Sequence, residues 1–416
     1  IVSHAKALRR QPPRVPARLD RLAAHASMTT SASAAEVSQR AQQWLKSHRY
    51  RFVVDDDGSL RAEAGRHRET GNLVFHIFLV FVLVGVGWNT LWGFKGTSVV
   101  VEGQGFSNSI TQYDEFKAGA MVDTDNLTPF SMKLRKFVVS FETGTVQRGA
   151  ARSFDATVDL TMGGKTQTRD LQVNHPLRIG STKVHLLGHG YAADVVVRDG
   201  DGKVAYSGPV VFLPQDANFK SVGVIKVPDA RPDRLAFQGF FLPTGAITAG
   251  GPTSLFPDAL NPQLYLTAWY GKPTVETGVP SNIYTLDTTG LTQVTNGKDK
   301  ARFVLSPGQR YKLPDGKGSI QFNGWQRWAK IQVSQNPGLP LTFLSVVLSV
   351  AGLCVSLFSR SRRVWVRTIP GDDGLRVEIG GLDRSDSRSG AVDDVNSLLA
   401  ALHGDSMSGD VGEEHS

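Results

Sequence analysis

The stretch GNLVFHIFLVFVLVGVGWNTLWGF, residues 71–94, decides the fold of this 416-residue chain. It carries no charged residue and is longer than the roughly 20 apolar residues that a helix needs to cross a bilayer. His76 lies near the start of this run. Ionisable side chains are costly in hydrocarbon, so a histidine inside a span is a candidate functional residue. The alternative is that His76 only caps the helix end or reaches the headgroup layer.

A second apolar run, LPLTFLSVVLSVAGLCVSLF at residues 339–358, also lacks charge. Basic residues typically flank the cytoplasmic ends of membrane spans. Such residues are Arg61, Arg66, His67 and Arg68 before the first run, and Arg360, Arg362, Arg363 and Arg367 after the second. Both clusters are therefore expected inside, and residues 95–338 outside. Trp88 and Trp92 fall at the outer end of the first span, an interfacial depth that aromatic residues favour.

Residues 1–70 are expected to form a basic cytoplasmic segment with a small α+β element. The first 25 residues are basic and rich in proline, and they lack the apolar core of a signal peptide. This start fits the flank of an earlier span lost upstream of Ile1. Binding of nucleic acid is disfavoured, because no folded nucleic-acid motif accompanies the basic stretch. Ser33 and Glu36 have capping-box spacing before a helix at 34–48, and Asp57-Gly58 predicts a hairpin.

Residues 95–338 contain many short runs of alternating apolar and polar residues, each bounded by Gly, Pro, Asn or Asp. This pattern predicts a large, mainly antiparallel all-β extracytoplasmic domain, a sandwich or an irregular barrel. The stretch 228–262, rich in Pro and Gly, is the best candidate for a long irregular connection or boundary. The chain has a single cysteine, Cys354, within the second span, so no disulfide framework supports this domain.

Residues 359–416 begin with the basic flank and continue as an acidic tail. From Gly371 onward the tail holds 11 Asp and Glu residues against 3 Arg, with many Gly and Ser. This composition predicts a mostly disordered cytoplasmic segment. Only LRVEI and VDDVNSLLAALHG have patterns of regular structure.

Two groups of residues in the outer domain are candidates for binding. His185 and His189 share the parity of one strand, so both could face the same side and hold a metal or an axial haem position. No third ligand follows at a recognisable spacing, which favours the alternative that they are structural or merely exposed. His175, before Pro176, is more typical of a turn or an edge. Trp325 and Trp328, in GWQRWAKIQV, could bind a flat anionic ligand or could anchor the domain on the membrane ahead of the second span.

His76 remains the strongest candidate. A neutral imidazole is a common axial ligand of haem iron, and haem is a flat apolar molecule that a membrane can shelter. A single histidine supplies one ligand, and the other span has none, so a second ligand would have to come from a partner subunit. The motifs of hydrolases, zinc proteases and nucleotide-binding loops are not found in the sequence, and a lone cysteine disfavours a disulfide reductase.

Four stretches, in this order, resemble the ResB (CcsB) family of system II cytochrome c biogenesis proteins. They are RHRETGNLVFHIFLVFVLVGVGWNTLWGFKG, LQVNHPLRIGSTKVHLLGHGYA, the pair FLPTGAI and FPDALNPQLYLTAWYG, and WAKIQVSQNPGLPLTFLSVVLSVAGLCVSLFSRSRRVWVR. Each motif alone is weak, but the combination is fairly specific. The family usually has two further spans before this region, and often Asp-Pro-Gly where this chain has Asn336-Pro337-Gly338.

The resemblance implies a multi-pass protein of the bacterial cytoplasmic membrane, acting with a ResC (CcsA) membrane protein that carries a tryptophan-rich haem-binding loop. Together such proteins move haem across the membrane and deliver it to apocytochrome c. His76 matches the family's membrane histidine, implicated as a haem ligand. Trp325 and Trp328 are candidates for the surface nearest haem or the partner. Whether the chain counts as part of a cytochrome c synthetase is open. The alternative from another class is a membrane-anchored sensor or scaffold without haem.

Overall fold

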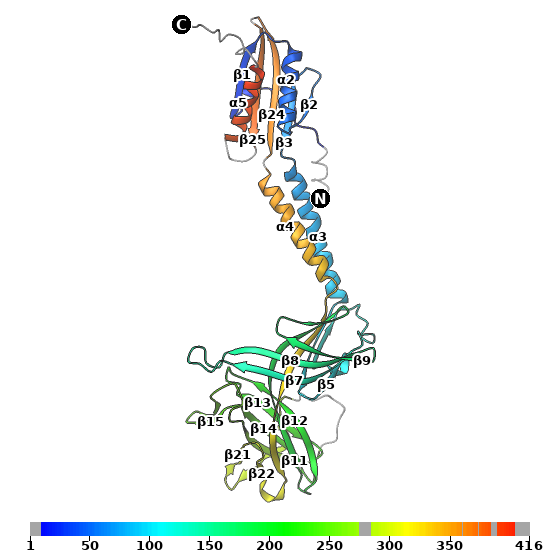
Figure 1. Cartoon of the computed structure of the whole chain (residues 1–416), viewed down its shortest axis with the longest axis vertical. Helices are drawn as coiled ribbons and strands as arrows, with labels where there is room; N and C mark the ends of the chain where they lie inside the picture. Colours follow the sequence, from blue (N-terminus) through cyan, green and yellow to red (C-terminus); the bar gives the residue numbers. More distant parts are fainter. Residues whose placement is uncertain (1–9, 274–283, 360, 373, 384–388, 404–416) are drawn as a thin grey trace, which may run out of the picture. The chain divides into compact units, whose positions relative to one another are not determined.

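The computed structural model describes residues 10–273, 284–359, 361–372, 374–383 and 389–403 (Figure 1). The chain forms two compact units. The helix–sheet unit comprises Ile1–Trp88 with Gly338–Ser416, and the β unit comprises Asn89–Pro337. The chain therefore leaves the helix–sheet unit once and returns to it once.

Five antiparallel strands form the sheet of the helix–sheet unit, in the order β1-β25-β24-β3-β2. Their bounds are Ala24–Thr30 (β1), Arg51–Val54 (β2), Leu60–Ala64 (β3), Arg362–Gly371 (β24) and Gly374–Asp383 (β25). Helices α2 (Ala34–Ser47) and α5 (Ser389–His403) pack together on one face of this sheet, where they share one apolar core with it.

The helix start and the hairpin predicted near the N-terminus are confirmed. The backbone N–H of Ser33 donates to Glu36 Oε2 at 2.9 Å, and the backbone N–H of Glu36 donates to Ser33 Oγ at 3.3 Å, which completes the capping box of α2. β2 and β3 are joined through Gly58, whose φ of 76° lies in the left-handed region that glycine adopts without steric cost.

The two patterns of regular structure expected in the tail are confirmed, because LRVEI lies within β25 and the described residues of VDDVNSLLAALHG lie within α5. Both elements extend beyond these patterns, and residues 384–388 and 404–416 lie outside the described residues. β25 is an inner strand, paired with both β1 and β24, and its Val377 and Ile379 are fully buried. In α5, the residues that face the core recur at helical spacing: Ala391, Val395, Leu398 and Leu402. These short patterns suffice despite the polar and acidic composition of the tail, because the rest of the sheet supplies the complementary surface.

Residues 10–22 cross the face of the sheet opposite α2 and α5. Three sheet side chains donate hydrogen bonds to the carbonyl groups of this strap: Arg61 Nη1 to Pro12 O at 3.1 Å, Trp365 Nε1 to Pro13 O at 3.0 Å, and Arg367 Nη1 to Ala17 O at 3.1 Å. Leu19 packs over Gly380, where a Cβ atom would lie 2.7 Å from Leu19 Cδ2. The described part of the basic start therefore has a structural role in covering the sheet.

The helices α3 (His67–Trp92) and α4 (Leu339–Phe358) are long and apolar enough to cross a membrane. α4 coincides with the predicted span, and α3 begins four residues before it. They lie side by side and antiparallel (Figure 1). A Cβ atom on Gly71 would lie 2.6 Å from Gly352 O, and Ser349 Oγ donates to Phe75 O at 3.4 Å. Small residues at these points allow close packing where lipid provides no hydrophobic drive.

The β unit is built from antiparallel strands, as predicted. Its main sheet has the order β18-β17-β14-β13-β12-β11-β23-β4-β6, with β10, β21 and β22 paired at its side. A four-stranded sheet, β5-β7-β8-β9, and two small hairpins, β15-β16 and β19-β20, complete the described strands. β21 pairs with β17 and β22 with β23, but β21 and β22 do not pair with each other, so the described strands form no closed barrel.

The strand bounds in this unit are as follows: Phe94–Val101 (β4), Gly105–Ser107 (β5), Glu115–Ala118 (β6), Ser131–Phe141 (β7), Ala151–Met162 (β8), Lys165–Gln172 (β9), Leu177–Ile179 (β10), Thr182–Arg198 (β11), Val204–Pro214 (β12), Ser221–Val227 (β13), Arg234–Leu242 (β14), Gly245–Thr248 (β15), Gly251–Ser254 (β16), Gln263–Gly271 (β17), Leu291–Gln293 (β18), Thr295–Asn296 (β19), Asp299–Lys300 (β20), Arg302–Leu305 (β21), Arg310–Lys312 (β22) and Ser319–Gln335 (β23). The stretch 228–262 is only partly irregular, because β14 is an inner strand of the main sheet.

Two apolar cores fill the β unit, and β11 and β23 contribute to both. The sheet-pair core lies between the four-stranded sheet and one half of the main sheet, and includes Phe106, Leu134, Val158, Val184 and Ile331. The curved-sheet core lies within the other half, and includes Tyr191, Phe212, Phe237, Leu266 and Phe322. These two long strands therefore join the halves of the unit.

We expect Val377→Asp to unfold the sheet of the helix–sheet unit, because it places an unpaired charge at a fully buried position of an inner strand. The expected loss of stability is about 3–5 kcal/mol, measured as a shift in the urea midpoint. Arg376→Gln, at the neighbouring exposed position, is the control and should shift the midpoint little. Equal midpoints for wild type and Val377→Asp would contradict the folded tail.

Candidate functional site

His76 lies on the third turn of α3, within the apolar part of the helix. At 1.5 Å per residue it is roughly 10 Å beyond Glu69, the last charged residue before the apolar run. This depth exceeds that of a helix cap. The side chain is half-buried in the structure. The position therefore fits a residue held inside the hydrocarbon layer.

A backbone hydrogen bond orients the His76 ring. Its Nδ1 lies 2.8 Å from the carbonyl oxygen of Asn72, one turn earlier, and the ring meets the edge of Phe75 at 5.1 Å between centroids. A carbonyl oxygen only accepts, so Nδ1 carries the proton. In the neutral imidazole, the lone pair then resides on Nε2. Histidines that bind metals characteristically donate their other N–H in this way, which fixes the tautomer and the ring.

The direction of His76 follows from the helix geometry. Gly71, Phe75 and Gly85 mark the side of α3 that touches α4. At 100° per residue, His76 lies about 140° around the helix from Gly71 and about 180° from Gly85. It therefore projects from the side of α3 turned away from α4. Trp88 and Trp92, predicted at the outer interface, are also exposed, near the end of the same helix.

The two tryptophans predicted to contact cofactor lie in different settings on β23. Trp328 is 4% exposed, and its Nε1 donates to the carbonyl oxygens of Tyr191 at 3.0 Å and Phe212 at 3.2 Å. This placement gives Trp328 a packing role, and its contact with haem stays a prediction. Trp325 is partly buried against Tyr191 and lies 5.6 Å from the guanidinium carbon of Arg327.

His185 and His189 do not share a face, contrary to the expectation from their spacing. The pairing of β11 with β23 shifts at Leu187: Leu186 pairs with Ile331, and Gly188 with Lys330. Such a bulge inserts one residue and reverses the alternation of side chains beyond it. His189 thus joins the inner face, and His185, opposite Gln332, lies on the other face. His175 is exposed at a β-bridge, as expected for an edge position.

His189 is buried among aromatic rings where the two cores of the β unit meet. Burial, and next the positive charge of Arg327, lower its pKa from 6.5 to about 4. The imidazole is therefore neutral near pH 7. Arg327 is itself buried and forms an ion pair of 2.7 Å with Asp258. The sequence pointed to the histidines of this strand but gave no signal for the bulge that separates them.

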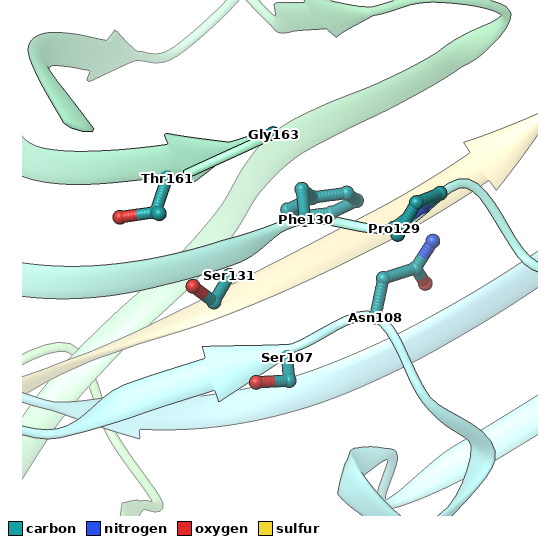
Figure 2. Close-up of a pocket in the computed structure, with 7 residues that line it drawn as sticks. All are labelled: Ser107, Asn108, Pro129, Phe130, Ser131, Thr161 and Gly163. Atoms are coloured by element: carbon teal, nitrogen blue, oxygen red, sulfur yellow. The ribbon is translucent and has the colours of Figure 1, made fainter. Parts of the chain in front are cut away.

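A surface pocket of about 360 Å³ lies beside β5, β7 and β8, away from these residues (Figure 2). It is lined by Ser107, Asn108, Pro129, Phe130, Ser131, Thr161 and Gly163. No lining residue ionises near neutral pH. The amide of Asn108 is occupied by Thr128 O and Tyr113 Oη, and Thr161 bonds to Thr166. This pocket therefore offers no chemistry beyond weak polar contact.

Among the described residues, no group of three or more His, Cys, Asp or Glu side chains could hold a metal ion. Cys354 is exposed on α4 rather than packed against α3. The arrangement of these residues therefore centres on two imidazoles in separate units, His76 in the apolar helix and His189 in the β unit.

Along the chain, one long apolar helix precedes the antiparallel β unit and another follows it, and the first helix contains a histidine. A model of the ResB-like family matches residues 1–392. The chain therefore belongs to the ResB-like family. This match includes both helices, the β unit and most of the segment after α4.

Curated relatives agree with the family. The cytochrome c biogenesis protein CcsB of Synechococcus sp. (strain JA-3-3Ab) is 23% identical over 316 residues, which cover 76% of this chain and 55% of the relative. The protein of the same name from Synechococcus sp. (strain WH7803) is 23% identical over 368 residues, which cover 88% of this chain and 69% of the relative. The chain spans about half the length of the first of these relatives.

We expect the β unit to lose stability as the pH falls from 7 to 5, and His189→Phe to reduce that loss. The pKa of His189 is about 4 when folded and near 6.5 when unfolded. Between these values the unfolded chain binds a proton that the folded chain does not, so acid favours unfolding. The effect of this histidine is on the order of 2 kcal/mol at pH 5 and close to zero above pH 7.

The measurement is the urea midpoint of detergent-solubilised protein at pH 7 and pH 5. His175→Phe serves as the control, because His175 is exposed. An equal loss of stability on acidification in wild type and His189→Phe would show that His189 is not buried in the neutral form.

Proposed function

We propose that this chain is the ResB-like subunit of a membrane complex that delivers haem to apocytochrome c outside the cytoplasmic membrane. The observation that supports this proposal most is His76, whose imidazole is oriented through Nδ1 within an apolar helix of a ResB-like family member. The names of the relatives place them in cytochrome c biogenesis. Haem is the cargo of such a system, and Nε2 of His76 supplies one axial ligand to its iron.

In this proposal α3 and α4 cross the membrane and the β unit lies outside. Basic residues at the helix ends near β3 and β24 support this orientation, since such residues stay on the cytoplasmic side. The helix–sheet unit then places its sheet, α2 and α5 in the cytoplasm. The β unit becomes the surface that meets the extracytoplasmic partners.

The second axial ligand comes from a partner subunit. His76 projects from the side of α3 turned away from α4, so a haem bound there lies between this helix pair and another membrane protein. A ResC (CcsA)-like protein is the partner in this proposal, and apocytochrome c is the acceptor. The residues of this chain bind and orient haem in the membrane, and bond formation to the cytochrome takes place on the assembled complex.

We expect His76→Ala to lower the yield of holocytochrome c by about tenfold or more in cells that depend on this protein, because iron loses a ligand. Added imidazole should restore part of the yield by filling the vacated position. The measurement is haem staining of cytochrome c in membranes, with the amount of this protein checked by immunoblot.

His67→Ala is the matched control, because His67 is exposed at the first residue of the same helix. It should leave the yield unchanged. Normal holocytochrome c in the His76→Ala strain would contradict the proposal and favour a sensor or scaffold without haem.

A further inference from the structure

The place where the two cores of the β unit meet has features of a binding site. Val184 and Leu186 of β11 belong to the sheet-pair core, and Tyr191 and Ala193 to the curved-sheet core. His189 lies between them on the same inner face, next to Arg327 of β23. We call His189, Arg327 and the aromatic rings around them the junction.

Aromatic side chains from three parts of the chain surround the His189 ring. Phe219, from the turn between β12 and β13, stacks on it at 4.6 Å between centroids and an interplanar angle of 22°. Phe154 lies at 5.2 Å and Phe137 at 5.7 Å, both from the four-stranded sheet. Phe141 lies at 6.2 Å. Together these rings form an apolar environment that suits a flat ligand.

Two buried polar atoms in the junction have no hydrogen-bond partner among the residues that the structure describes: His189 Nδ1 and Arg327 Nη1. The residues are 9% and 6% exposed, respectively. The other terminal nitrogen of Arg327 donates to Asp258, so Nη1 remains as an additional donor. A buried polar group without a partner costs about 1–3 kcal/mol, so each atom is suited to a ligand that completes its bonding.

The chain next to the junction carries exposed apolar side chains. Residues 243–262 include Asp258, which holds Arg327, and Phe256, which contacts Phe141. The exposed side chains in this segment are Ile247 at 67%, Leu255 at 60% and Leu260 at 66%. Phe219, which stacks on the His189 ring, has a φ of 59°, which is unfavourable for a bulky residue.

We propose that the junction is a second haem-docking site, in which His189 offers an imidazole nitrogen to iron and Arg327 Nη1 donates to a propionate. The chemistry matches on three counts: a neutral imidazole for iron, a guanidinium N–H for a carboxylate, and aromatic rings for the macrocycle. Phe219 covers the imidazole, so docking requires its turn to move outward. This inference rests on the proposed function and extends it to a station outside the membrane.

The test is titration of the purified full chain, in detergent, with ferric haem, followed by the Soret band. The background is His76→Ala, which removes the membrane ligand. Into it we place His189→Phe or, as the matched control, His185→Phe on the opposite face of the same strand. Replacing a buried polar ring without a partner by an apolar ring of similar shape is close to neutral for folding, and near-ultraviolet circular dichroism verifies this.

We expect His76→Ala to retain a Soret complex, His189→Phe to weaken that complex at least about tenfold, and His185→Phe to leave it unchanged. Equal haem affinity with and without His189 overturns the inference. Haem binding by wild type that His76→Ala abolishes overturns this inference alone. Absence of haem binding in wild type contradicts the proposed function as well.

Discussion

The position of His76 depends on two antiparallel strand pairs, β3 with β24 and β4 with β23, which adjoin the two ends of α3 and α4 in the chain. β3 ends three residues before α3 begins, and its Ala64 pairs with Arg362 at the start of β24, which follows α4. β4 begins two residues after α3 ends, and its Phe94 pairs with Gln335 at the end of β23, which precedes α4. Each helix is thus tied to its neighbour through strands at both ends. A slip of one helical turn, about 5.4 Å, would break these registers.

The small residues between the helices have the complementary role. Because Gly71 and Gly352 let the backbones of α3 and α4 approach closely, one side of α3 packs against α4. His76 projects from the side of α3 turned away from α4. In the proposed function, this side of α3 is where haem and a partner subunit meet His76. The β unit has a second imidazole, buried by different means: aromatic packing, a neighbouring arginine and a strand bulge.

The sequence was a good guide where local chemistry determines structure. Residues 339–358 are mostly apolar and carry no charge, so α4 was predicted with its observed bounds. Ser33 and Glu36 specify the start of α2 because a capping box needs only residues three apart. The resemblance of four stretches led to the family that the comparison shows.

Other features depend on contacts between distant residues, and the sequence could not reveal them. The bulge at Leu187 is defined by the pairing of β11 with β23, which the sequence of β11 alone does not show. The spacing of His185 and His189 therefore predicted a shared face that the structure does not have. The sequence marked regular patterns within β25 and α5, but it did not reveal that β25 is an inner strand paired with β1 and β24. Trp328 looked like a surface residue among charges, yet its indole reaches the carbonyls of Tyr191 and Phe212 in the interior.

The most direct test of the central claim is the visible spectrum of the protein purified together with its membrane partner, wild type beside His76→Ala. The account predicts a six-coordinate haem spectrum in the wild-type complex and a changed or weakened one in the mutant. An identical haem spectrum in both would contradict the role of His76 as a ligand, and the absence of haem from the wild-type complex would contradict haem delivery by this protein.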